Sequence, residues 1–138
     1  MQILNRQEMT AADQYTIQTL GIPGATLMES AAQAIVTAML PRLSRKDRIV
    51  VLAGTGNNGG DGIAIARRLN NLGYDVALWL IPPVGKVKDA AKVHLDCYLR
   101  HGYTCQPFSD QIYTAIRHAT VVVDAMLGVG MSLSLIHI

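Results

Sequence analysis

Aromatic residues and net charge are both scarce in this chain of 138 residues. Aromatic side chains make up 5% of it, and 12 Lys and Arg nearly balance 10 Asp and Glu. Single-stranded nucleic acid is bound by basic grooves that carry stacking aromatics, so we expect no nucleic-acid partner. The basic cluster at Arg42–Arg48 is interpreted as a solvated loop. No apolar run approaches the roughly 18 residues of a membrane-spanning segment, and we expect no membrane association.

Cysteine is equally rare, and no export signal is visible. The two cysteines, Cys97 and Cys105, do not have the close spacing of a metal-binding pair. Cys97 lies in a helical pattern and is predicted to be a small core residue. The first twenty residues are polar and mixed, without the apolar segment of a secretory signal. We therefore expect a cytoplasmic protein with reduced thiols.

The hydrophobic half of the chain is arranged in alternating patterns that suit one domain. Two helical patterns come first, and the second begins at a capping box of Thr26 and Glu29 and ends at Pro41. Strands are predicted at 49–53, 76–81 and 121–125, with a weak one at 103–107, and helices at 63–72, 89–100 and 110–118. In the 89–100 helix the predicted inward positions are Ala91, Val93, Leu95 and Leu99.

This alternation predicts an α/β fold with a Rossmann-like parallel sheet. Helices should cover both faces of the sheet, two helices should precede it, and the sheet should be incomplete. Residues 1–130 are predicted to form one incomplete domain, and 131–138 an atypical tail that alternates at period two. A short terminal strand at 133–138 is the alternative for this tail.

A glycine-rich segment, Gly54–Gly62, lies between the first strand and the next helix. It fits G-x-G-x-x-G, but a dinucleotide fold also needs an acid at the end of the second strand. That strand ends in Leu80-Ile81-Pro82-Pro83, without an acid. A P-loop needs Gly-Lys-Ser/Thr, which is absent as well. The segment matches neither standard phosphate motif.

Oxygen-bearing side chains gather at the same predicted sheet edge. Asn57, Asn58 and Asp61 follow the first strand, and Asp124 ends the last one. Amide and carboxylate oxygens are ligands for hard cations, and a second glycine loop, Gly128–Gly130, follows Asp124. Turn chemistry for the two asparagines and turn or helix capping by Asp124 are the alternatives. A binding site is predicted at this edge.

Three stretches of the chain resemble one known family. Residues 53–69, Ala-Gly-Thr-Gly-Asn-Asn-Gly-Gly-Asp-Gly-Ile-Ala-Ile-Ala-Arg-Arg-Leu, resemble the signature loop and helix of the NAD(P)H-hydrate epimerases, the YjeF N-terminal domain family. Residues 21–31 are similar to the family's second-helix motif, and 122–130 to its later strand and loop. The matches occur in the family's order.

The resemblance implies an isomerase that repairs damaged nicotinamide nucleotides. Such an enzyme interconverts the R and S forms of hydrated NADH and NADPH (NADHX and NADPHX), so that a fused or separate dehydratase can restore the S form. The resemblance implies a bound potassium ion with Asn58 and Asp124 as ligands, and it leaves a homo-oligomer open. The implied substrate-binding residues are Asn57, Asn58, Gly59, Gly60 and Asp61, followed by Gly128, Val129, Gly130, Met131, Ser132, Leu133 and Ser134.

One motif of the family is missing from these residues. The family continues into an Asp-x-Pro-Ser-Gly segment that carries the proposed catalytic aspartate, whereas no Asp follows Asp124 here. No catalytic residue is therefore assigned, and little epimerase activity is expected of these 138 residues alone. A non-catalytic nucleotide- or protein-binding module of the same fold is the alternative. An ordinary NAD-linked oxidoreductase is disfavoured by the missing strand-end acid.

Overall fold

A four-stranded parallel sheet forms the centre of the molecule. The structure, a computed structural model, describes residues 21–81 and 86–126. The strands are β1 (Arg48–Ala53), β2 (Asp75–Leu80), β3 (Cys105–Pro107) and β4 (Val121–Ala125), in the order β3-β2-β1-β4. All four strands were predicted, including the weak one. The predicted N-terminal helix before residue 21 and the tail 131–138 lie outside the described residues.

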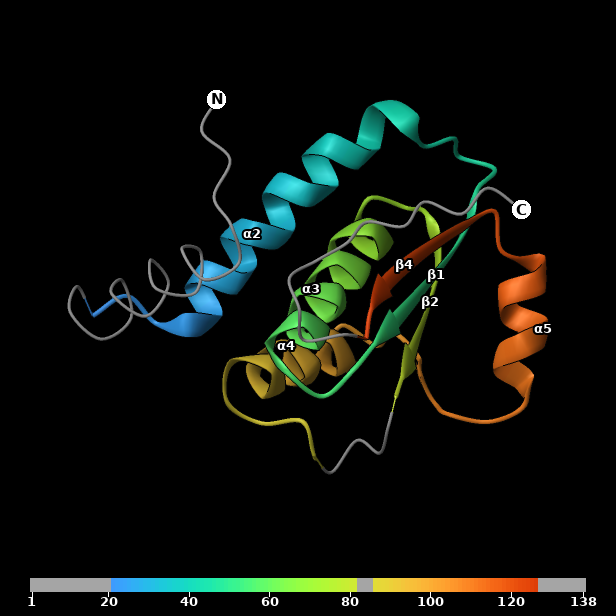
Figure 1. Ribbon diagram of the computed structural model, residues 1–138. Helices are drawn as coiled ribbons and strands as arrows, with labels where there is room; N and C mark the ends of the chain where they lie inside the picture. The colour runs from blue at the N-terminus through green and yellow to red at the C-terminus, as the bar shows by residue number, and fades with distance from the viewer. Residues whose placement is uncertain (1–20, 82–85, 127–138) are drawn as a thin grey trace.

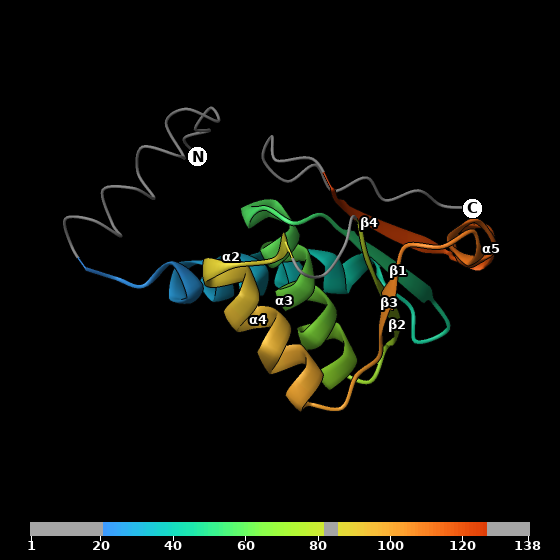
Figure 2. The same ribbon diagram turned by 90° about the horizontal axis from the view of Figure 1, so that it is seen from below.

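Helices cover both faces of this sheet, as the α/β prediction requires. Helices α2 (Gly24–Met39), α3 (Asn57–Asn71) and α4 (Asp89–Arg100) lie on one face, and α5 (Gln111–His118) lies on the other (Figures 1 and 2). A short 3₁₀ turn, η1 (Leu40–Arg42), follows α2. None of the helices in the described ranges combines the length and the apolarity that a membrane span requires.

The apolar strand runs are explained by two separate cores. Ile49 and Val51 of β1 pack in the larger core with α2, α3 and α4, while Val50 and Leu52 pack in the smaller core with α5. Because successive side chains of a strand point to opposite faces, both sets must be apolar. This burial on two faces is why the sequence could predict a parallel sheet.

The start of α2 differs from the predicted capping box. The helix begins at Gly24, and the Pro23 carbonyl accepts hydrogen bonds from the N–H groups of Thr26 (3.0 Å) and Leu27 (3.3 Å). No side chain caps this helix. Glu29 cannot serve the predicted box because its carboxylate bonds Arg67 and Arg68 of α3 instead.

Helix α4 has the predicted bounds, and Ala91 and Leu95 are buried as predicted, but the rest of its buried face differs. Val93 and Leu99, predicted to point inward, are 55% and 46% exposed, whereas His94 and Tyr98 are buried. Cys97, predicted as a core residue, is only half-buried. Apolarity alone misplaced the face because His94 and Tyr98 satisfy their polar atoms inside: His94 Nε2 lies 2.8 Å from the Ala25 carbonyl, and Tyr98 Oη donates to the Thr104 carbonyl.

Candidate functional site

The carboxyl ends of β1 and β4 meet at one edge of the sheet, as predicted. The two strands are neighbours, with Ala53 in register with Ala125. Beyond the strands, the Gly54 N–H donates to the Ala125 carbonyl at 3.0 Å. The residues that follow β1 and those that end β4 therefore lie side by side at this edge, and such edges are the usual ligand sites of open α/β sheets.

Most of the predicted glycine loop is helical. Helix α3 begins at Asn57, directly after its N-cap residue Gly56, so only Gly54–Gly56 connect it to β1. The prediction of a flexible loop through Gly62 is therefore wrong. The helical glycines permit close packing: an added Cβ would lie 2.6 Å from the Ala125 Cβ at Gly62 and 2.5 Å from the Met28 sulfur at Gly60. At Gly59 it would overlap the Gly54 carbonyl oxygen.

Asn58 and Asp124 belong to the two segments that meet at Gly54. Asn58 is 8% exposed in the first turn of α3. It is next to Gly59, where an added Cβ would overlap the Gly54 carbonyl oxygen. Asp124 lies one residue before the Ala125 that accepts the Gly54 N–H. One side chain offers an amide oxygen and the other a carboxylate, a donor set that suits a hard cation.

Asp124 also makes the turn-capping contact that was the alternative for it. Its Oδ1 accepts the Met126 N–H at 3.0 Å, which fixes the backbone as it leaves β4. A carboxylate has two oxygens and about four acceptor positions, so this bond is compatible with a cation on the same group. Asp124 is half-buried, so part of it remains exposed to solvent.

The remaining site predictions concern residues of two kinds. Gly59, Gly60 and Asp61 lie in the first turns of α3, with Asn57 as its first residue. Gly128, Val129, Gly130, Met131, Ser132, Leu133 and Ser134 lie outside the described residues. Within 21–81 and 86–126 no cluster of three His, Cys, Asp or Glu side chains could hold a metal. That finding does not bear on a site built on asparagine and a single aspartate.

Sequence reasoning missed an ionic network that joins the three helices behind the site. The Glu29 carboxylate bonds Arg67 and, at 2.6 Å, Arg68, both of α3, and its Oε2 lies 3.6 Å from His94 Nδ1 of α4. Burial raises the pKa of Glu29, but the Arg67 hydrogen bond and the charges of Arg67, Arg68 and His94 together hold it below its ordinary value. In the sequence Glu29 was interpreted as a capping-box acid, so no local signal identified this network.

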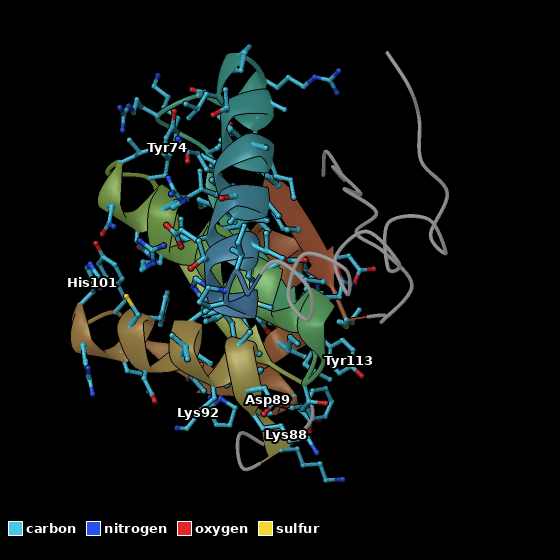
Figure 3. The ribbon with its side chains drawn as sticks, turned by 90° about the vertical axis from the view of Figure 1, so that its left-hand side faces the viewer. Tyr74, Lys88, Asp89, Lys92, His101 and Tyr113 are labelled. Carbon is cyan, nitrogen blue, oxygen red and sulfur yellow. The ribbon has the colours of Figure 1, made fainter. Side chains whose placement is uncertain are left out.

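The first turn of α4 packs beside the candidate site, which the sequence did not indicate. Its Ala91 would lie 2.9 Å from a Cβ at Gly60, so this turn packs directly on the first turn of α3. Figure 3 shows Lys88, Asp89 and Lys92 together at this end of α4. Asp89 has a φ of 57°, in the left-handed region, which Asp tolerates better than most residues.

Comparison with known proteins assigns the family. The model of the family described as "YjeF-related protein N-terminus" matches residues 24–136. The chain belongs to this family. A protein of Limosilactobacillus reuteri named NAD(P)H-hydrate epimerase is 41% identical over 131 residues, covering 94% of this chain and 59% of that protein. A protein of Leuconostoc kimchii with the same name is 36% identical over 132 residues, covering 96% of this chain and 56% of that protein.

The fold of the YjeF-related family is also seen in a solved structure. The yeast protein YNL200c superposes with a TM-score of 0.71 at 23% identity, over 96% of this chain and 59% of that one. The chain thus spans little more than half the length of the proteins it matches. The α/β architecture predicted from sequence agrees with this neighbour.

Proposed function

We propose that the protein containing this chain interconverts the R and S forms of NADHX and NADPHX. Membership of the YjeF-related family and the name of its relatives, NAD(P)H-hydrate epimerase, support this reaction. The observation that carries the proposal is the junction at Gly54, which brings the first turn of α3 and the end of β4 to one sheet edge. A dinucleotide can be held there from both sides.

Two segments are assigned to the substrate. The first is Asn57–Asp61, where the backbone N–H groups of the first turn of α3 and its two asparagines can bind phosphate or amide groups. The second is Gly128–Ser134, which follows β4 in sequence after Met126 and Leu127. Both assignments rest on the family motif and on the position of α3 and β4 at the carboxyl edge.

A potassium ion is the proposed cofactor, with Asn58 and Asp124 as ligands. Their oxygen chemistry fits a hard cation, and their sequence neighbours Gly59 and Ala125 both lie against Gly54. When bound, the ion would supply positive charge near the anionic part of the substrate. If this is correct, potassium should raise the melting temperature of the protein more than sodium does, and Asp124→Ala should abolish the difference. An equal response to both salts in the parent would contradict the cation assignment.

Epimerisation needs a proton donor or acceptor within hydrogen-bond reach of the reacting carbon. No such residue is assigned among the 138 residues; the family's Asp-x-Pro-Ser-Gly motif would carry it. The chain's own part is to bind and orient the nucleotide. The companion enzyme would be a dehydratase specific for the S form, fused or separate. The free thiols of Cys97 and Cys105 are consistent with a reducing, cytoplasmic location.

The experiment that tests this function follows the two hydrates directly. Purified R-NADHX is incubated with the protein, and the R and S forms are separated by chromatography over time. We expect approach to an equilibrium mixture at a rate above the spontaneous one. Binding of the hydrate without conversion would favour a non-catalytic nucleotide-binding module, and no binding would contradict both the epimerase and that module. Light scattering on the same sample reports whether the protein is a homo-oligomer.

A further inference from the structure

Gly56 differs from the other glycines of the Gly54–Gly62 segment. A Cβ added at Gly54 would lie 2.7 Å from the Met126 carbonyl oxygen. Cβ atoms added at Gly59, Gly60 and Gly62 would come even closer to neighbouring atoms. At Gly56 no described atom lies within 4 Å of the Cβ position. Packing therefore explains four of these glycines and leaves Gly56 unexplained.

Backbone conformation does not explain Gly56 either. Its φ is −85° and its ψ is −168°, an extended conformation that any residue adopts. Positive φ, the usual reason for glycine in a turn, is found instead at Gly73 (+89°) and Gly102 (+85°), just after α3 and α4.

Helix capping would even favour a different residue at this position. Gly56 is the N-cap of α3, and no side chain caps this helix end. Serine, aspartate and asparagine are the preferred N-cap residues because their side-chain oxygens accept the first free N–H groups. The fold would tolerate such a side chain, and α3 would gain from it.

We infer that Gly56 keeps the sheet edge open for the nucleotide, which contacts the main chain at this position. This inference rests on the proposed function. Gly56 is exposed and stands between Gly54, which contacts the end of β4, and Asn58, in the first turn of α3. A ligand that bridges these two segments passes over the Gly56 backbone. A side chain there would occupy the space in which part of the hydrated dinucleotide makes van der Waals contact with the main chain.

The test compares Gly56→Ala, Gly56→Ser and Gly56→Val with the parent in the full protein, measuring melting temperature and the KM for R-NADHX. We expect melting temperatures equal to or above that of the parent. KM should rise roughly tenfold for alanine, equivalent to about 1.4 kcal/mol, and further for valine. Gly73→Ala is the control, because it replaces a glycine with φ of +89° at the far end of α3. It should lower the melting temperature and leave KM unchanged.

The possible results separate the two proposals. If the parent converts the hydrate and all three Gly56 variants keep its KM, the inference is wrong and the proposed function stands. If the Gly56 variants lose as much thermal stability as Gly73→Ala, the fold itself needs this glycine and the inference is also wrong. If the parent neither binds nor converts the hydrate, the proposed function fails and the inference fails with it.

Discussion

At the residue scale, glycines with quite different roles stand side by side in one motif. Gly59 and Gly62 let α3 approach β1 and β4, where a Cβ would overlap the Gly54 carbonyl or lie 2.6 Å from Ala125. The sequence could predict that this cluster marks a site between a strand and a helix. It could not assign the individual roles, because these depend on which neighbour each Cα faces across the fold.

Alanine at Gly59 and at Gly60 should therefore have unequal effects on stability. Gly59→Ala pushes a Cβ into backbone, which cannot move locally, and should cost about 1–3 kcal/mol or more. Gly60→Ala meets the flexible end of Met28 as its nearest neighbour, and should cost less. Urea unfolding of both variants checks this order, and a Gly59→Ala variant as stable as the parent would contradict the packing described.

Glu29 should give the protein a measurable pH dependence of stability. Its pKa is lowered in the folded state, so the stabilisation by the ionised carboxylate is present above the unfolded-state pKa and is lost as pH falls through the folded-state pKa. Glu29→Gln should lower the unfolding free energy by roughly 1–3 kcal/mol near neutral pH. The difference from the parent should shrink under acidic conditions. Urea unfolding across this pH range measures the difference in unfolding free energy. Gln33→Glu, which adds a carboxylate at an exposed position, is the charge control. A difference independent of pH would show that lost packing, rather than charge, is responsible.

At the element scale, the local sequence pattern predicted which helices and strands form better than it predicted which of their faces are buried. The four strands and the bounds of α4 were predicted because runs buried on two faces and helix-ending glycines leave clear local signals. The inward face of α4 was predicted only in part. Ala91 and Leu95 are buried as predicted, but His94 and Tyr98 are also buried, through bonds to Ala25 and Thr104. The start of α3 was set too late, since glycines usually weaken a helix and only tertiary packing makes them useful here.

The short strand β3 makes a prediction about its cysteine. Burial raises the pKa of the Cys105 thiol to about 11, so very little reactive thiolate exists near neutral pH. Cys105 should resist iodoacetamide in the folded protein at pH 8 and react readily in urea, as peptide mass spectrometry would show. Its rate should climb as pH approaches 11. Rapid modification of Cys105 in the folded protein at pH 8 would contradict the packing of this partly buried side chain against the larger core.

At the scale of the whole molecule, the candidate site depends on the register of the sheet. The order β3-β2-β1-β4 places β4 beside β1, so that Asp124 and the Gly54 turn share an edge although 70 residues separate them in the chain. The sequence predicted this shared edge because parallel strands end on the same side. The contact through Gly54 itself, and the ionic network behind α3, required the three-dimensional arrangement.

The 138 residues assayed alone should show little epimerase activity. They hold the proposed binding edge but no assigned proton donor or acceptor, and loss of general acid–base catalysis typically costs about 10²–10⁴-fold in rate. Chromatography of the two hydrates measures this, with the longer protein as control. Turnover near that of the longer protein would show that the catalytic group lies within these residues.

We propose that the Gly54 junction, with Asn58 of α3 and Asp124 of β4, forms the site for the hydrated nucleotide. The most direct measurement is the rate of R to S conversion of NADHX by the full protein, compared with Asn58→Ala and Asp124→Ala variants that remain folded. We expect conversion by the parent and a loss of roughly tenfold or more in kcat/KM for each variant. Parent-like rates in both folded variants would contradict it.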